Sequence, residues 1–149
     1  MHLSIHPFIV HKRFALTISR GTTAESTNIW VRLTHDDIEG WGEASPFAVG
    51  GAQTADYLSA SLEAIAPHLA DFTPYDRQPI DHIVASKGIP SAARNALDLA
   101  LHDWIGKKLG IPLWKLWGGD RTSIVPTSVT IGISSPEAAR ERLHHWMQA

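Results

Sequence analysis

The chain has 149 residues, of which 44% are hydrophobic and 19% charged, and its formal net charge is −2. This composition is that of a folded globular chain and excludes intrinsic disorder. The near-neutral charge offers no electrostatic basis for binding nucleic acid or a membrane surface, so we expect a small molecule or another protein as partner. The absence of cysteine excludes disulfides, thiolate metal sites and cysteine nucleophiles. Short apolar runs and a start unlike a signal peptide predict a soluble, cytoplasmic protein.

The first third of the chain has the alternation of antiparallel strands. In residues 28–34, Ile29, Val31 and Leu33 fall on one face, and polar residues take the other face except at Trp30. The following HDDIEG predicts a turn. Further extended segments are expected at 3–10, 14–18 and 41–44, which makes this region an antiparallel meander.

Helical spacing replaces the alternation from Thr54, a predicted N-cap, to about Ala70. A second, less regular helix is expected near 79–86. The strongest helix runs from about Ser91 to Leu109, with lysines in its last turn and Gly110 as its stop. A sheet followed by helices predicts an α+β fold.

A third pattern begins after residue 120. Residues 125–133 (VPTSVTIGI) predict a buried strand, and Ser135 followed by Pro136 and Glu137 predicts the start of a helix that reaches the C-terminus. A strand that opens a β-then-α unit needs a parallel partner, and none follows in this sequence. We therefore expect the chain to be truncated.

Histidines and carboxylates are the first candidates for chemistry. The chain has nine histidines, but His144 and His145 point to different faces of a helix, so surface histidines are favoured over a metal site. Asp98 and Asp103 are five residues apart on one helix and share a face poorly. Pairing with Arg94, Lys107 or an adjoining loop is therefore favoured over an acid/base pair.

Two loops are candidates for ligand binding. Arg20 lies in the small polar stretch SRGTTAES (19–26), where its planar guanidinium could close over a carboxylate. The alternative is an exposed cation paired with Glu25. Gly50 and Gly51 follow Phe47–Val49 and predict a second loop with an apolar tip. Two such loops at one end of a sheet indicate a lid.

No catalytic motif can be assembled from these residues alone. The sequence contains no supported Ser-His-Asp set, no GxGxxG, no P-loop, and no lysine placed as a base at the end of a buried strand. From the residues alone, the prediction is an α+β domain with a lid-like edge, joined to an α/β body that this sequence does not contain.

The order of the motifs resembles the enolase superfamily, in its muconate-lactonising subgroup. The matching stretches are GWGEA (40–44) with Pro46, then 93–110, then IPLWKLWGG (111–119), and then VTIGI with SPE. The resemblance implies an N-terminal capping domain over 1–120, made of a three-stranded meander followed by helices. It also implies that 121–149 begin a (β/α) barrel. Glu43 and Trp41 are then structural, and the glycines let the backbone turn closely.

Within the subgroup, the motifs resemble dipeptide epimerases of the L-Ala-D/L-Glu type. The resemblance implies that Arg20 contacts the acidic side chain of a dipeptide and that Thr130 hydrogen-bonds the substrate. Substrate contacts are also expected from Phe47, Val49 and Gly50. The loop is one residue shorter between the arginine and TAES than the family form, which shortens the reach of Arg20.

The reaction of that family removes the proton α to a carboxylate, with Mg²⁺ stabilising the enediolate and two lysines returning the proton. The resemblance places these groups on later barrel strands. We therefore expect no catalytic residue and no metal ligand in this chain, no bound Mg²⁺ and no turnover by the chain alone. A homo-oligomer is expected. The alternatives are a fragment of a muconate cycloisomerase or o-succinylbenzoate synthase, and a stand-alone module for binding or assembly.

Overall fold

The structure is a computed structural model that describes residues 1–46 and 53–148. The chain forms two compact units. One comprises Met1–Phe8 and Thr27–Arg121 and is called the sheet unit below. The other comprises Ile9–Ser26 and Thr122–Ala149 and is called the hairpin unit.

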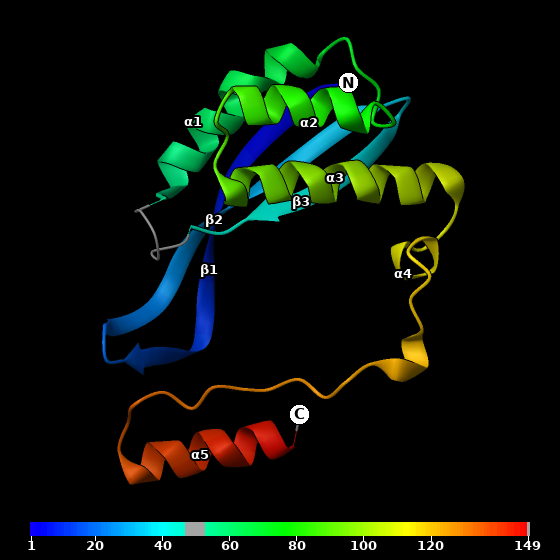
Figure 1. The fold of residues 1–149 in the computed structure, drawn as a ribbon. Coiled ribbons are helices and arrows are strands. Elements are labelled where there is room, and N and C mark those ends of the chain that lie inside the picture. The colour runs from blue at the N-terminus through cyan, green and yellow to red at the C-terminus, as the bar shows by residue number, and fades with distance from the viewer. Residues whose placement is uncertain (47–52, 149) are drawn as a thin grey trace. The chain divides into compact units, whose positions relative to one another are not determined.

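Three strands form one sheet in the order β1-β2-β3, as Figure 1 shows: β1 (His2–Ile18), β2 (Gly21–His35) and β3 (Ile38–Ala44). β2 and β3 are antiparallel, with Ile29 opposite Ala44 and His35 opposite Ile38. Asp36 and Asp37 make the turn with φ of 48° and 57°, the left-handed pair that a two-residue hairpin needs. The predicted meander is confirmed, although β1 is continuous where two separate segments were expected.

The helices agree closely with the sequence pattern. They are α1 (Ala55–Ile65), η1 (Ala66–Leu69), α2 (Arg77–Ser86), α3 (Ser91–Leu109), α4 (Leu113–Leu116), η2 (Arg121–Ser123) and α5 (Pro136–Met147). Thr54 is the N-cap of α1, and its hydroxyl accepts from the Tyr57 amide at 3.2 Å. Gly110 ends α3 in the left-handed conformation with φ of 66°. Both predicted boundaries are confirmed.

The hydrophobic core lies in the sheet unit, between one face of the sheet and helices α1, α2 and α3 (Figure 1). Ile29, Val31 and Leu33 have no exposed surface, which confirms the face assigned from their alternation. The helices contribute Leu58, Leu62, Ile80, Val84, Leu97 and Trp104. The opposite face carries Trp30, which is 44% exposed.

The glycines of GWGEA allow α3 to pack closely on β3. A Cβ on Gly40 would lie 2.1 Å from the Ala100 carbonyl oxygen, and one on Gly42 would lie 1.9 Å from that of Ala96. Both glycines are strand residues, so the expectation that they serve a backbone turn is wrong. They are needed because no side chain fits between this strand and this helix.

In the hairpin unit, the predicted C-terminal helix is confirmed as α5, whereas the prediction of a strand at 125–133 is wrong. Ser135 caps α5 by accepting from the Ala138 amide at 3.3 Å. Residues 124–132 have no regular secondary structure, and Val125 and Ile133 are 79% and 65% exposed. A β-strand exists only as part of a hydrogen-bonded ladder, and no ladder partner is present for this segment in the described residues.

Candidate functional site

Arg20 lies at the tip of the β1–β2 hairpin. Ser19 and Arg20 alone form the turn, and Arg20 is exposed. Most of the polar loop expected over 19–26 is therefore strand, since β2 begins at Gly21 and pairs with β1. The β-branched residues Thr22 and Thr23 favour this extended conformation. The hydroxyls of Thr17 and Thr22 are 2.9 Å apart across the hairpin. A two-residue turn holds Arg20 closer to the strands than a long loop would.

The hairpin does not show the pairing of Arg20 with Glu25 that was the alternative to ligand binding. Glu25 lies 3.3 Å from His11, measured from its Oε2 to the histidine Nδ1. In the described part of the chain, no ion pair is formed by Arg20. Its guanidinium is thus available to an anionic ligand.

Thr130 lies in the exposed segment before α5, residues 124–134, which is called the Thr130 segment below. This segment contacts the β1–β2 hairpin. The Ile133 amide donates to the Thr17 carbonyl at 2.8 Å. Gly132 lies against the Thr17 backbone so closely that a Cβ would fall 2.8 Å from the Thr17 carbonyl oxygen. The structure therefore joins the hairpin and the Thr130 segment within one unit, although no hydrogen bond links Arg20 to Thr130 directly among the residues described.

Phe47, Val49 and Gly50, the other predicted substrate contacts, lie outside the described residues. The residues just before this segment are held by a cluster of polar side chains. The side-chain amide of Asn28 donates through Nδ2 to Glu43 Oε1 at 2.6 Å, and the Ser45 hydroxyl donates to Asn28 Oδ1 at 3.2 Å. Asn28 is only 7% exposed. Glu43 has the structural role expected of it, because its carboxylate satisfies a buried amide.

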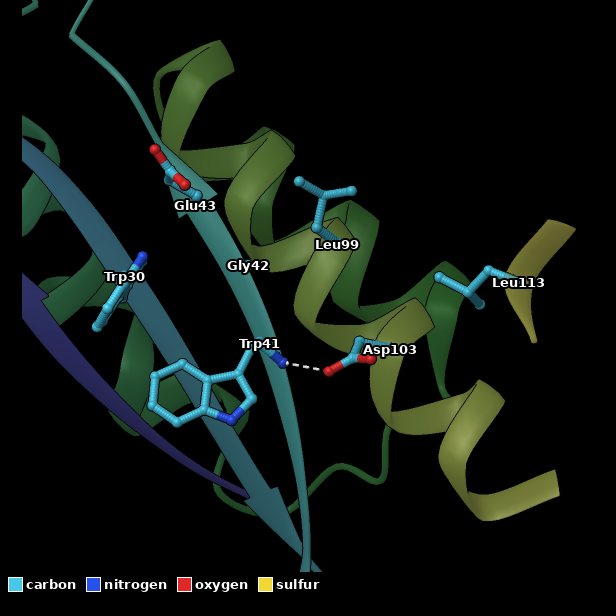
Figure 2. Close-up of a pocket in the computed structure, with 7 residues that line it drawn as sticks. All are labelled: Trp30, Trp41, Gly42, Glu43, Leu99, Asp103 and Leu113. Atoms are coloured by element: carbon cyan, nitrogen blue, oxygen red, sulfur yellow. Dashed lines mark hydrogen bonds between the residues drawn. The ribbon is translucent and has the colours of Figure 1, made fainter. Parts of the chain in front are cut away.

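A groove of about 620 Å³ runs along the free edge of β3, as Figure 2 shows. Its walls are the indoles of Trp30 and Trp41 on one side and Leu99 and Leu113 on the other, with Gly42, Glu43 and Asp103 between them. The sequence analysis did not identify this groove. The available signal was Trp30, an aromatic residue on the polar face of its strand.

The carboxylates near the groove are bound to structural donors. Asp103 accepts from the Trp41 amide at 2.8 Å (Figure 2) and from Lys107 Nζ at 2.7 Å, so the expected pairing with Lys107 is confirmed. Lys107 also donates to the Glu39 carbonyl at 2.8 Å. These bonds use backbone groups on the outer edge of β3, which protects that edge from pairing with another strand.

Asp98 also has a structural role, but with different partners from those expected. It pairs with Arg77 of α2 and lies 3.3 Å from His102 Nδ1. Arg94 instead pairs with Asp81 at 3.2 Å. Asp98 and Asp103 therefore lie in separate clusters and do not form an acid/base pair.

Two carboxyl groups of the sheet unit have lowered pKa values, and both lie away from the candidate site. The pKa of Asp36 is lowered because Lys108 donates a hydrogen bond at 3.0 Å and attracts the carboxylate. The pKa of Asp76 is lowered because the amide and hydroxyl of Thr73 donate to it at 2.7 and 2.8 Å. Both pKa shifts reflect local structure, because each carboxylate accepts hydrogen bonds from side chains or backbone groups that contact it.

The described residues do not form a site that fits a divalent metal. No three histidine, aspartate or glutamate side chains converge in residues 1–46 and 53–148. Mg²⁺ needs oxygen ligands around one point, and the carboxylates described above are separated and paired. No helix in the same residues is long and apolar enough to cross a membrane.

Comparison with known proteins identifies the family. Residues 4–118 match the model of the mandelate racemase/muconate lactonizing enzyme N-terminal domain. A hydrophobic dipeptide epimerase from a Flavobacteria bacterium is 40% identical over 147 residues, 96% of this chain and 40% of that protein. The L-Ala-D/L-Glu epimerase of Bacteroides thetaiotaomicron is 28% identical over 145 residues, 95% of this chain and 37% of that protein.

Solved structures show the same fold. A dipeptide epimerase from Cytophaga hutchinsonii, complexed with Mg and the dipeptide D-Ala-L-Val, superposes with a TM-score of 0.87 at 22% identity. The superposition covers 98% of this chain and 40% of that one. The chain thus spans about 40% of the length of the relatives it matches. Its three-stranded sheet with following helices is the N-terminal capping domain of enolase-superfamily enzymes, and the chain belongs to the mandelate racemase/muconate lactonizing enzyme family.

Proposed function

We propose that this chain is the N-terminal part of a dipeptide epimerase, and that it supplies substrate contacts while the rest of the enzyme supplies the chemistry. The main support is the match to dipeptide epimerases along 95–96% of the chain. The relatives extend well beyond the matched region, and the residues described here contain no converging metal ligands. In this proposal, Mg²⁺ and the proton-transferring residues belong to the larger enzyme, which is cytoplasmic and oligomeric.

Within the proposal, Arg20 and Thr130 contact the dipeptide. Arg20 is exposed and has no ion pair in the described residues, as a cation that receives a ligand carboxylate requires. Thr130 lies in the segment that the Thr17–Ile133 hydrogen bond joins to the same hairpin. Phe47, Val49 and Gly50 are assigned to the substrate on the family resemblance alone.

Two substrate classes are in competition. Arg20 favours a dipeptide with an acidic side chain, because a guanidinium binds a carboxylate in a bidentate manner. The relative with 40% identity is named for hydrophobic dipeptides, which favours an apolar side chain. The acidic class is our first proposal and the hydrophobic class is the second.

The test is exchange of the α-proton in D₂O with Mg²⁺, followed by ¹H NMR, using the polypeptide from the complete reading frame that contains this sequence. We expect exchange with L-Ala-L-Glu. Exchange confined to apolar dipeptides would replace the acidic class by the hydrophobic one. Turnover only of muconate or of an o-succinylbenzoate precursor would overturn the epimerase assignment. The 149-residue chain alone is expected to give no exchange, and exchange by it would contradict our division of roles.

A matched pair of variants tests Arg20. In the full enzyme, Arg20→Gln should raise KM for L-Ala-L-Glu about tenfold and leave kcat nearly unchanged, because it removes binding common to the ground and transition states. Lys87→Gln removes a positive charge from an exposed position in the sheet unit and should change neither constant. Equal effects of the two variants would show that only net charge matters.

A further inference from the structure

A second cavity lies wholly within the hairpin unit. Its volume is about 260 Å³, and β1, the Thr130 segment and α5 all contribute to it. Three of its lining residues are cationic, two are aromatic and one carries a hydroxyl: Lys12, Arg13, Arg142, Phe14, Trp146 and Thr130. No acidic residue lines it. This combination does not occur in the groove beside β3, where the charged lining residues are carboxylates.

Within the described residues, carboxylates do not neutralise the positive charge around the cavity. In the residues that the structure describes, none of Lys12, Arg13 and Arg142 forms an ion pair with a carboxylate. The carboxylate of Glu25, the acidic residue in the hairpin strands, lies 3.3 Å from His11 Nδ1 instead. Cationic residues that line one cavity without counter-ions raise the local potential and attract an anion.

The charges of the two units differ in sign. The hairpin unit has five lysines and arginines against three acidic residues, a net charge of +2, whereas the sheet unit has eight against twelve, a net charge of −4. The positive charge of the chain is therefore in excess in the unit that holds this cavity. An anionic ligand would be attracted to that unit and repelled by the other.

The aromatic residues provide an apolar wall and fix one of the cations. The rings of Phe14 and Trp146 meet edge to face, with centroids 6.3 Å apart. The guanidinium carbon of Arg142 lies 5.6 Å from the centroid of Phe14. A guanidinium held over a ring keeps the N–H groups along its edge free to donate.

We propose that this cavity binds a small carboxylate that carries an aromatic or branched apolar group. The apolar group lies against Phe14 and Trp146, and the carboxylate accepts hydrogen bonds from Arg142 and its neighbouring cations. The volume suits a ligand with a single ring, since cavities for drug-sized molecules are larger, at roughly 300–1,000 Å³. The proposal goes beyond the epimerase assignment, because Thr130 is the one residue lining this cavity that the epimerase proposal assigns to the dipeptide.

The test is titration of the polypeptide from the complete reading frame with 3-phenylpropionate, followed by ¹H–¹⁵N NMR. We expect saturable shifts of the Phe14, Thr130 and Trp146 amides. The uncharged 3-phenylpropionamide should bind at least tenfold more weakly, because it cannot form charge-assisted hydrogen bonds. Equal affinity for the two compounds would overturn the proposal. Tighter binding of phenyl phosphate at the same amides would replace the carboxylate by a phosphate as the ligand class.

Variants on α5 provide a matched comparison. Arg142→Gln should weaken binding of 3-phenylpropionate about tenfold. Arg140→Gln removes the same charge from an exposed position of the same helix that does not line the cavity, and should leave the affinity unchanged. Equal weakening by both variants would mean that the affinity depends on net charge alone, and would overturn the proposal of a binding site in this cavity. Lys12→Gln, at an exposed strand residue, repeats the test in case Arg142→Gln disturbs the packing on Phe14.

Discussion

The two units contain similar apolar residues, but these are buried in the sheet unit and exposed in the hairpin unit. In the sheet unit, Ile29 and Leu33 are completely buried between the sheet and three helices. In the hairpin unit, Ile133 is 65% exposed and Met147 on α5 is 78% exposed. Every hydrophobic residue that is buried in the described structure belongs to the sheet unit. An apolar residue contributes to stability only where another element covers it, so the two units should respond very differently to the same substitution.

The largest expected effect comes from deleting an isoleucine side chain in each unit. Ile29→Ala should lower the free energy of unfolding by about 4 kcal/mol, because it opens a cavity in a closed core. Ile133→Ala should change it by less than about 0.5 kcal/mol, because this side chain is exposed. Urea denaturation measures both. Similar losses for the two variants would mean that the Ile133 segment is buried in solution.

The next largest effect concerns the contact between β3 and α3. Gly42→Ala should destabilise the chain by about 3 kcal/mol, since the new Cβ would overlap the Ala96 carbonyl and force the helix away from the strand. Gly88→Ala is the control. Its Cβ would meet no atom within 4 Å, and only the left-handed backbone (φ 64°) should cost about 1 kcal/mol. If the two variants lost equal stability, close packing at Gly42 would not be the cause.

A smaller effect separates the two helix caps. Thr54→Ala should lower the free energy of unfolding by about 1 kcal/mol, because α1 is part of the cooperative core. Ser135→Ala removes the same kind of cap from α5, which has no buried residue. Here we expect lower helicity in circular dichroism and faster amide exchange in α5, with no change in the urea midpoint. A change in the midpoint would show that α5 unfolds together with the sheet unit.

The smallest effect is the dependence of the sheet unit on acidic pH. Asp36 and Asp76 have pKa values below the ordinary 3.8 in the folded state, so their contribution to stability is present above that value. It is lost as the pH falls through 3.8 toward the folded pKa values. The urea midpoint should therefore decrease on acidification below about pH 4, and less steeply in a variant combining Asp36→Asn with Asp76→Asn. An unchanged slope in this variant would exclude both residues as its source.

Local sequence determined most of the secondary structure and which face of β2 is buried. The alternation of Ile29, Val31 and Leu33 identified the core face, and Thr54, Gly110 and Ser135 marked helix boundaries that the structure confirms. These features depend on neighbouring residues and on capping bonds within one turn, so they can be predicted from a single sequence. The motif order also indicated the family that the comparisons identify.

The tertiary structure decided which apolar segments are covered and which polar residues meet. Residues 125–133 have the pattern of a strand but no ladder, because a strand depends on a partner that its own sequence cannot specify. The sequence could not show that Gly40 and Gly42 face α3, or that Lys12, Arg13 and Arg142 line one cavity. Both arrangements join residues far apart in the chain, and such contacts are fixed by packing between elements.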